Sequence, residues 1–94
     1  MPTRAAVLSQ LADVFAELYV KQESAMTMAA SAGLRLSRIS LYAQSLATWH
    51  AILEEAETQG RTLELITRAS QQYPAYAPLH EASQAYADWV AAAA

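Results

Sequence analysis

Apolar residues recur at helical spacing along most of the chain, with polar residues at the positions between them. The first series predicts a helix from about Thr3 to Lys21, with Thr3 as its N-cap. Its members are Val7, Leu8, Leu11, Val14, Phe15 and Leu18. A shorter helix is predicted from Ser24 to Ser31, ended by Gly33 in the left-handed conformation and buried through Met26, Met28 and Ala29.

Three further helices are predicted in the second half of the chain. Leu46, Trp49, Ile52, Leu53 and Ala56 predict a helix from Leu46 to Gln59, capped by Ser45 and closed by Gly60. Leu63, Ile66, Ala69 and Tyr73 predict a helix from Leu63 to Gln72, capped by Thr62. It must stop there, because Tyr73 precedes Pro74 and is pushed out of the helical region.

The last helix is predicted to begin near Pro78, with its apolar stripe on Leu79, Ala82, Tyr86 and Trp89 or Val90. Residues 34–43 have a less regular pattern that fits either an extended piece or a short helical turn. We favour the turn, because a lone strand has nothing to pair with. Short links force successive helices to pack as neighbours. The sequence therefore predicts an all-α compact bundle of five to six helices.

The core of this bundle is expected to form around the large apolar residues of the predicted stripes. A buried Trp removes roughly 150 to 250 Å² from water, which makes Trp49 the expected centre. The other expected core anchors are Phe15, Leu18, Ile52, Leu53, Leu63, Ile66 and Tyr73.

Composition narrows the function classes. The 94 residues suffice for one domain, and 54% hydrophobic residues with two glycines and three prolines disfavour disorder, sandwiches and barrels. The chain has no cysteine, which excludes thiol nucleophiles and thiolate metal sites and suits a reducing cytoplasm. No cofactor is expected.

Charge and hydropathy predict neither a nucleic-acid partner nor a membrane. The net charge is −3 and the six basic residues are scattered, so no basic patch can track a phosphate backbone. No stretch approaches the roughly 20 apolar residues of a membrane span, and Asp13 and Glu17 in the first apolar run do not fit a signal peptide. We therefore expect a cytoplasmic protein.

The sequence contains no motif that specifies a catalytic or metal-binding site. His50 and Glu54 are four residues apart on one predicted helix face, but two ligands are too few for a metal, and a surface ion pair or a partly packed histidine is the simpler interpretation. Serines, histidines and aspartates are present without a nucleophile elbow or a glycine-rich oxyanion loop. The chain is therefore expected not to be an enzyme.

Two charged groups form the candidate interaction surface. Glu54, Glu55, Glu57 and Glu64 surround the predicted Gly60 turn, and Arg35 and Arg38 follow Gly33. They can be ordinary solvated surface. They can also be opposite patches that meet head to tail between copies, the geometry that builds open assemblies.

The chain contains, in this order, Gly33-Leu34, Arg38-Ile39, Trp49, Ile52-Leu53, Glu55-Ala56, Gly60, Leu63, Leu65-Ile66, Ala69, Tyr73-Pro74 and Leu79. This order resembles the effector-associated domain family of bacterial conflict systems, type 1. The most specific parts are Arg38-Ile39 ahead of Trp49, the Gly60 turn and the Tyr73-Pro74 stop. The resemblance covers Leu11 to Leu79. It implies a Death-like helical bundle that tethers a partner protein.

The resemblance thus implies a non-catalytic adaptor that recruits a protein carrying a related domain, possibly a second copy, in bacterial defence or signalling. Residues 1–94 are expected to be a single domain. The carboxyl end, Trp89-Val90 followed by four alanines, has no stop signal, so we expect the domain to be part of a longer protein with a fused effector. The alternative is a structural oligomerisation or peptide-binding bundle unrelated to defence.

Overall fold

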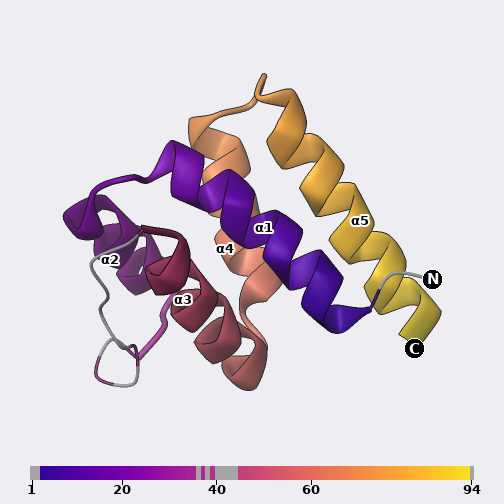
Figure 1. Ribbon diagram of the computed structural model, residues 1–94, viewed down its shortest axis with the longest axis horizontal. Helices are drawn as coiled ribbons and strands as arrows, with labels where there is room; N and C mark the ends of the chain where they lie inside the picture. Colours follow the sequence, from indigo (N-terminus) through magenta and orange to yellow (C-terminus); the bar gives the residue numbers. More distant parts are fainter. Residues whose placement is uncertain (1–2, 36, 38, 40–44, 94) are drawn as a thin grey trace.

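The computed structural model describes residues 3–35, 37, 39 and 45–93, and five helices with no strand are formed by these residues (Figure 1). The helices are α1 (Arg4–Leu18), α2 (Gln22–Ser31), α3 (Ser45–Gln59), α4 (Thr62–Gln72) and α5 (Ala77–Ala93). The predicted all-α class is confirmed. The short element expected within residues 34–43, and the predicted cap by the Ser45 side chain, fall largely outside what the structure describes.

Helix α1 begins as predicted and ends earlier than predicted. The Thr3 hydroxyl accepts a hydrogen bond from the Ala6 N–H at 3.1 Å, which satisfies a backbone donor of the first turn. The helix stops at Leu18 rather than Lys21, because Tyr19 leaves the helical region with φ −124° and ψ 70°. The freed carbonyl of Tyr19 accepts the indole N–H of Trp49 at 3.2 Å.

Helices α2 and α3 are each ended by a glycine with a left-handed backbone conformation. Gly33 and Gly60 have φ of 82° and 70°, a region that costs other residues steric strain. After α2, the N–H groups of Gly33 and Leu34 donate to Ala30 and Ala29, and after α3 the N–H of Arg61 donates back to Ala56. These bonds satisfy helix carbonyls that would otherwise lack a donor. Both stops were predicted from the sequence.

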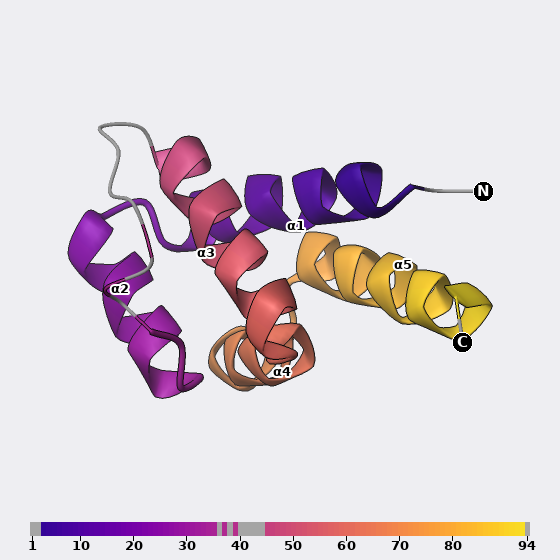
Figure 2. The ribbon, with the colours of Figure 1, turned by 90° about the horizontal axis from the view of Figure 1, so that it is seen from below.

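Helix α1 lies at the centre of the bundle and packs along α5 on one side and α3 on the other (Figure 1). Helix α2 packs against α3 and α4. In both views α2 and α5 lie at opposite ends of the longest axis, which measures 32 Å, with α4 between them (Figure 2).

Aromatic rings join α1 to α3 in the core. Phe15 and Trp49 are fully buried, and Tyr19 lies against the same indole with 5.7 Å between ring centroids. The Tyr19 hydroxyl donates to the side-chain oxygen of Gln72 at 2.6 Å, which ties the end of α1 to the end of α4. Burial and the neighbouring Tyr73 raise the pKa of Tyr19 to about 12. The predicted burial of Trp49, Phe15, Ile52, Leu53 and Ile66 is confirmed, and Leu18 packs partly buried against them.

The predicted stripe of α4 is confirmed at Ile66 and Ala69 and is wrong at Leu63 and Tyr73. Leu63 is 55% exposed and Tyr73 is 38% exposed, so neither is a core anchor. The buried positions of α4 are Thr62, Leu65, Ile66 and Ala69. This set follows the i, i+3, i+4, i+7 spacing of one helix face, and Leu63 lies off that face. Leu46 of α3, also placed in a stripe, is 41% exposed.

Thr62 does not cap α4, contrary to the prediction. Arg61 occupies the N-cap position and makes no side-chain capping bond. Thr62 is already inside the helix, and its hydroxyl donates to Glu57 Oε2 at 2.6 Å. The Thr62 hydroxyl, expected to cap α4, therefore donates instead to a carboxylate of the preceding helix, five residues earlier.

Candidate functional site

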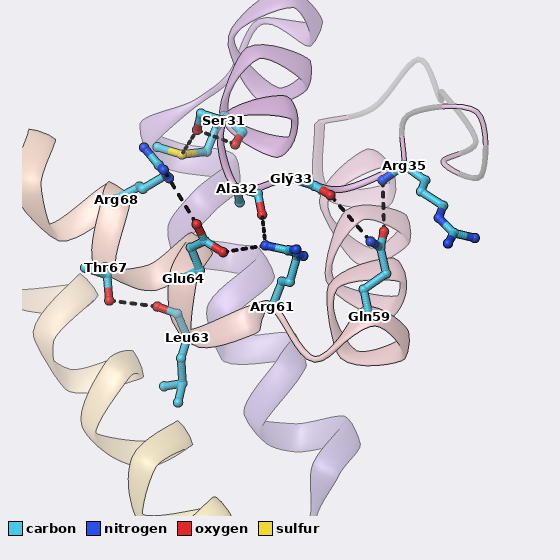
Figure 3. A network of polar contacts seen from close by, with 11 residues as sticks. Ser31, Ala32, Gly33, Arg35, Gln59, Arg61, Leu63, Glu64, Thr67 and Arg68 are labelled. Atoms are coloured by element: carbon cyan, nitrogen blue, oxygen red, sulfur yellow. Dashed lines mark hydrogen bonds and ion pairs between the residues drawn. The ribbon is translucent and has the colours of Figure 1, made fainter.

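Three arginines lie around the corner where α2 ends and α4 begins (Figure 3). We call Arg35, Arg61 and Arg68 the arginine corner. Arg61 Nη1 lies 2.8 Å from Glu64 Oε2 and donates to the carbonyl of Ala32 at 3.4 Å. Its guanidinium covers Gly33, because a Cβ added to that glycine would lie 3.0 Å from Nη1. Arg61 thereby fastens the start of α4 to the end of α2.

Glu64 forms ion pairs with two of these arginines. Arg68 Nη2 lies 3.5 Å from Glu64 Oε1, one helical turn along α4, while Arg61 occupies the other carboxylate oxygen. Both arginine side chains are 45% exposed. Within the described residues a single carboxylate therefore faces two guanidinium groups, and positive charge is left over at this corner.

Arg35 adds to this positive charge from the chain segment after Gly33. Its backbone N–H donates to Gln59 Oε1 at 2.9 Å, and the Gln59 amide donates to the Gly33 carbonyl at 3.4 Å. These bonds hold the backbone of Arg35 against the end of α3. In Figure 3 the guanidinium points away from Gln59 and from the other two arginines, and Arg35 is exposed. Arg38, its predicted companion, lies outside the described residues.

The predicted acidic cluster does not form one surface. Glu64 belongs to the arginine corner, and Glu55 is only 9% exposed, so it is not a surface residue. Glu54 of α3 faces α1 instead, where its Oε2 is 3.3 Å from Arg4 Nη2. These glutamates are close to Gly60 in the sequence, but successive residues of a helix point in different directions and need not share one surface.

Glu57 is a structural carboxylate rather than a surface group. Its side chain is 12% exposed, and its Oε2 accepts hydrogen bonds from the hydroxyls of Thr62 at 2.6 Å and Tyr86 at 2.7 Å. Arg4 Nε lies 3.6 Å from Oε1. The group thus links α1, α3, α4 and α5. Burial and the bond to Glu57 raise the pKa of Tyr86 to about 12.

Sequence reasoning missed several of these partners. The spacing of Arg61, Glu64 and Arg68, i, i+3 and i+7, is visible in the sequence as a helical ion-pair series. The contacts of Arg4 with Glu54 and Glu57 join residues about fifty positions apart, and no local pattern indicates them. No sequence pattern indicates the role of Gln59, because its hydrogen bond to the Arg35 backbone depends on the path of the chain after Gly33.

An open groove lies between the end of α1, one face of α2 and the end of α4. Its volume is about 470 Å³. Leu18, Tyr19, Met28 and Tyr73 supply apolar walls, and Glu23, Ser24, Thr27, Ser31 and Gln72 supply polar ones. A smaller hollow of about 360 Å³ on α3 is lined by Ala47, His50, Ala51 and Glu54.

Metal ligands are not gathered anywhere in the described part of the chain, where no group of three His, Asp or Glu side chains is placed to hold an ion. His80 Nε2 lies 2.6 Å from the carbonyl of Pro74, so this ring fastens the turn before α5. Among the described helices none is long and apolar enough to cross a membrane.

Comparison with known proteins identifies the family. The sequence profile of effector-associated domain 1 matches residues 1–87 of the 94. No curated protein and no solved structure matches the chain significantly. The profile spans all five helices except the end of α5, including the arginine corner and the Trp49 core. The chain therefore belongs to the effector-associated domain 1 family.

Proposed function

We propose that this chain is a non-catalytic adaptor domain that recruits a protein carrying a related domain in a bacterial conflict or signalling system. Membership of the effector-associated domain 1 family carries the proposal. The five-helix bundle is compatible with the Death-like architecture that the family resemblance implies. An effector fused in the same protein supplies the chemistry, and the domain works in the cytoplasm, where a chain without cysteine is ordinary.

The surface supports a contact made through charged groups. The large apolar side chains are mostly committed to the core, with Val20, Leu46, Leu63, Tyr73 and Val90 as the exposed large hydrophobics among the described residues. Arg35 has an exposed guanidinium, and Arg61 and Arg68 share one carboxylate. An anionic surface on a related domain complements such a group.

The test is capture and self-association at two salt concentrations. We expect the purified chain to bind a related domain, or a second copy, at an ionic strength of about 0.05 M. We expect the complex to dissociate at about 0.5 M, because the screening length falls from roughly 14 to 4 Å. Light scattering at high protein concentration measures the self-association. A chain that stays monomeric at low salt and captures no related domain contradicts the proposal.

A matched pair of variants controls for net charge. Arg35→Glu should weaken the complex, whereas Lys21→Glu changes the charge equally at an exposed position in the α1–α2 link. Equal weakening by both variants would indicate a general effect of net charge rather than a specific surface.

The rival function is peptide binding, which the groove of about 470 Å³ favours. Its mixture of apolar and polar walls is typical of sites that hold a ligand segment. Thr27→Arg would fill this groove. Loss of partner capture in that variant, with Arg35→Glu without effect, would favour the rival over the charged contact.

A further inference from the structure

The arginine corner has more positive charge than its own carboxylate balances. Arg61 and Arg68 share Glu64, and among the described residues the Arg35 guanidinium has no carboxylate within ion-pair distance. All three side chains reach solvent. Gln59 holds the backbone of Arg35, the Arg61 guanidinium donates to the Ala32 carbonyl, and Arg68 lies within α4. The corner is thus a preorganised cationic surface that suits an anionic partner.

The opposite charge lies on α1 and α5. We call Asp13, Glu17, Glu81 and Asp88 the acidic face; all four are exposed. None of them has a cation within ion-pair distance in the described chain. The lone described arginine of these two helices, Arg4, is directed to Glu54 and Glu57 of α3.

Contacts between the helices bring the two acidic helices together. Helices α1 and α5 pack side by side (Figure 1). Glu17 Oε2 accepts the hydroxyl of Tyr76 at 2.6 Å, which holds the acidic side of α1 next to the start of α5. Glu81 and Asp88 are seven residues apart, two helical turns, so they lie on one side of α5.

The arginine corner and α5 lie on different sides of α4. The arginine corner adjoins the end of α2, and α5 lies at the other end of the longest axis, with α4 between them (Figures 2 and 3). Helix α2 and α5 are not packed against each other. One copy therefore cannot neutralise its own arginine corner with its own α5.

We propose that the arginine corner of one copy binds the acidic face of a second copy. This inference rests on the proposed function and names the surfaces through which it acts. A symmetric contact of either surface with itself would oppose like charges, whereas a head-to-tail contact pairs unlike ones. Because each copy keeps one surface free, the contact repeats and builds an open chain of copies.

Two charge-neutralising variants of the full chain test the pairing. The acidic-face variant carries Glu81→Gln and Asp88→Asn, and leaves Glu17 to hold Tyr76. The corner variant carries Arg35→Gln and Arg68→Gln, and leaves Arg61 to hold Ala32. The control carries Glu23→Gln and Glu54→Gln, which removes two exposed carboxylates from outside both surfaces. Circular dichroism of each variant checks that the fold is kept.

We expect each of the two test variants to self-associate about 2- to 30-fold more weakly than the parent chain, because exposed ion pairs are individually weak. The control should associate as the parent does. An equimolar mixture of the two test variants should associate more strongly than either variant alone, with the 1:1 dimer as the main associated species, since one intact pair of surfaces is restored. Sedimentation velocity distinguishes the dimer from longer assemblies.

Three results would overturn the inference. The first is salt-sensitive self-association of the parent that both test variants retain; it rejects these surfaces and leaves the proposed function standing. The second is a mixture that associates no more strongly than either variant alone. The third is a parent that binds a related domain and never itself, which rejects a second copy as the occupant. A parent that binds neither rejects the proposed function as well.

Discussion

The ring of Phe15 stacks on the indole of Trp49, with 4.7 Å between the centroids and 17° between the ring planes. This contact joins α1 to α3 at the centre of the bundle, and the indole N–H is satisfied by the Tyr19 carbonyl. Phe15 of α1 thus packs on the ring of Trp49, and Tyr19 at the end of that helix accepts its N–H. Removing the indole would leave a cavity and an orphaned carbonyl together.

Trp49→Ala is expected to lower the free energy of unfolding by about 3 to 5 kcal/mol, a large share of the stability of a domain of this size. Urea denaturation followed by circular dichroism measures the loss. Leu46→Ala, on the same helix at an exposed position, should cost less than about 1 kcal/mol. Similar midpoints for the Trp49 variant and the parent would contradict the assignment of the core.

Leu63 and Leu65 offer a matched comparison within α4. Leu65 is fully buried and Leu63 is largely exposed, two residues away. We expect Leu65→Ala to cost about 2 to 5 kcal/mol and Leu63→Ala less than about 0.5 kcal/mol. The reverse order of the two losses in denaturant unfolding would show that α4 has the other register.

Tyr86→Phe is expected to change the alkaline stability of the protein. The folded-state pKa of Tyr86 is raised to about 12 from its ordinary 10, so the folded state favours the protonated phenol. The resulting stability is fully present below pH 10 and is lost as the pH rises toward 12. The phenylalanine variant should be less stable at pH 7, because Glu57 loses a donor, and its stability should fall less steeply between pH 10 and 12.

Unfolding free energies from pH 8 to 12 provide the measurement for the Tyr86 variant. Tyr19 also has a pKa raised to about 12, so part of the alkaline decline should remain in Tyr86→Phe. Parallel curves for the variant and the parent would exclude Tyr86 as a source of the decline.

Gly33→Ala and Gly60→Ala are expected to cost about 1 to 2 kcal/mol each, because both positions have a left-handed backbone. Only at Gly33 would the added Cβ press on the guanidinium of Arg61. Arg61→Ala should therefore cost less in the Gly33→Ala background than in the Gly60→Ala background. A double-mutant cycle in denaturant measures this difference, and equal costs would contradict the contact.

Much of the fold follows from local signals. Thr3, Gly33, Gly60 and the Tyr73-Pro74 pair each mark a helix end through their own backbone or side-chain chemistry. Such signals act within a few residues, so they can be read without knowing the neighbours in space. The exact face that each helix buries is less local. Leu63 and Leu65 are equally apolar, and the packing of α4 against α2 and α3 decides between them.

The charged surface was less predictable than the fold for a related reason. A glutamate on an exposed-looking position can be drawn into the interior by donors from other helices, as Glu57 is by Thr62 and Tyr86. Conversely, the acidic face combines residues from two helices near the two ends of the chain, which pack against each other in the fold. Pairing over such sequence distances has no local signature.

The two tryptophans have different surroundings, so their intrinsic fluorescence can report on two different parts of the protein. Trp49 is sealed in the core, whereas Trp89 is partly buried on α5, beside Asp88 in sequence and 5.8 Å from the ring of Tyr86. Unfolding transfers both indoles to water, but an event at the outer side of α5 reaches Trp89 alone. Changes in indole fluorescence that survive Trp49→Phe therefore originate at α5, without any attached dye.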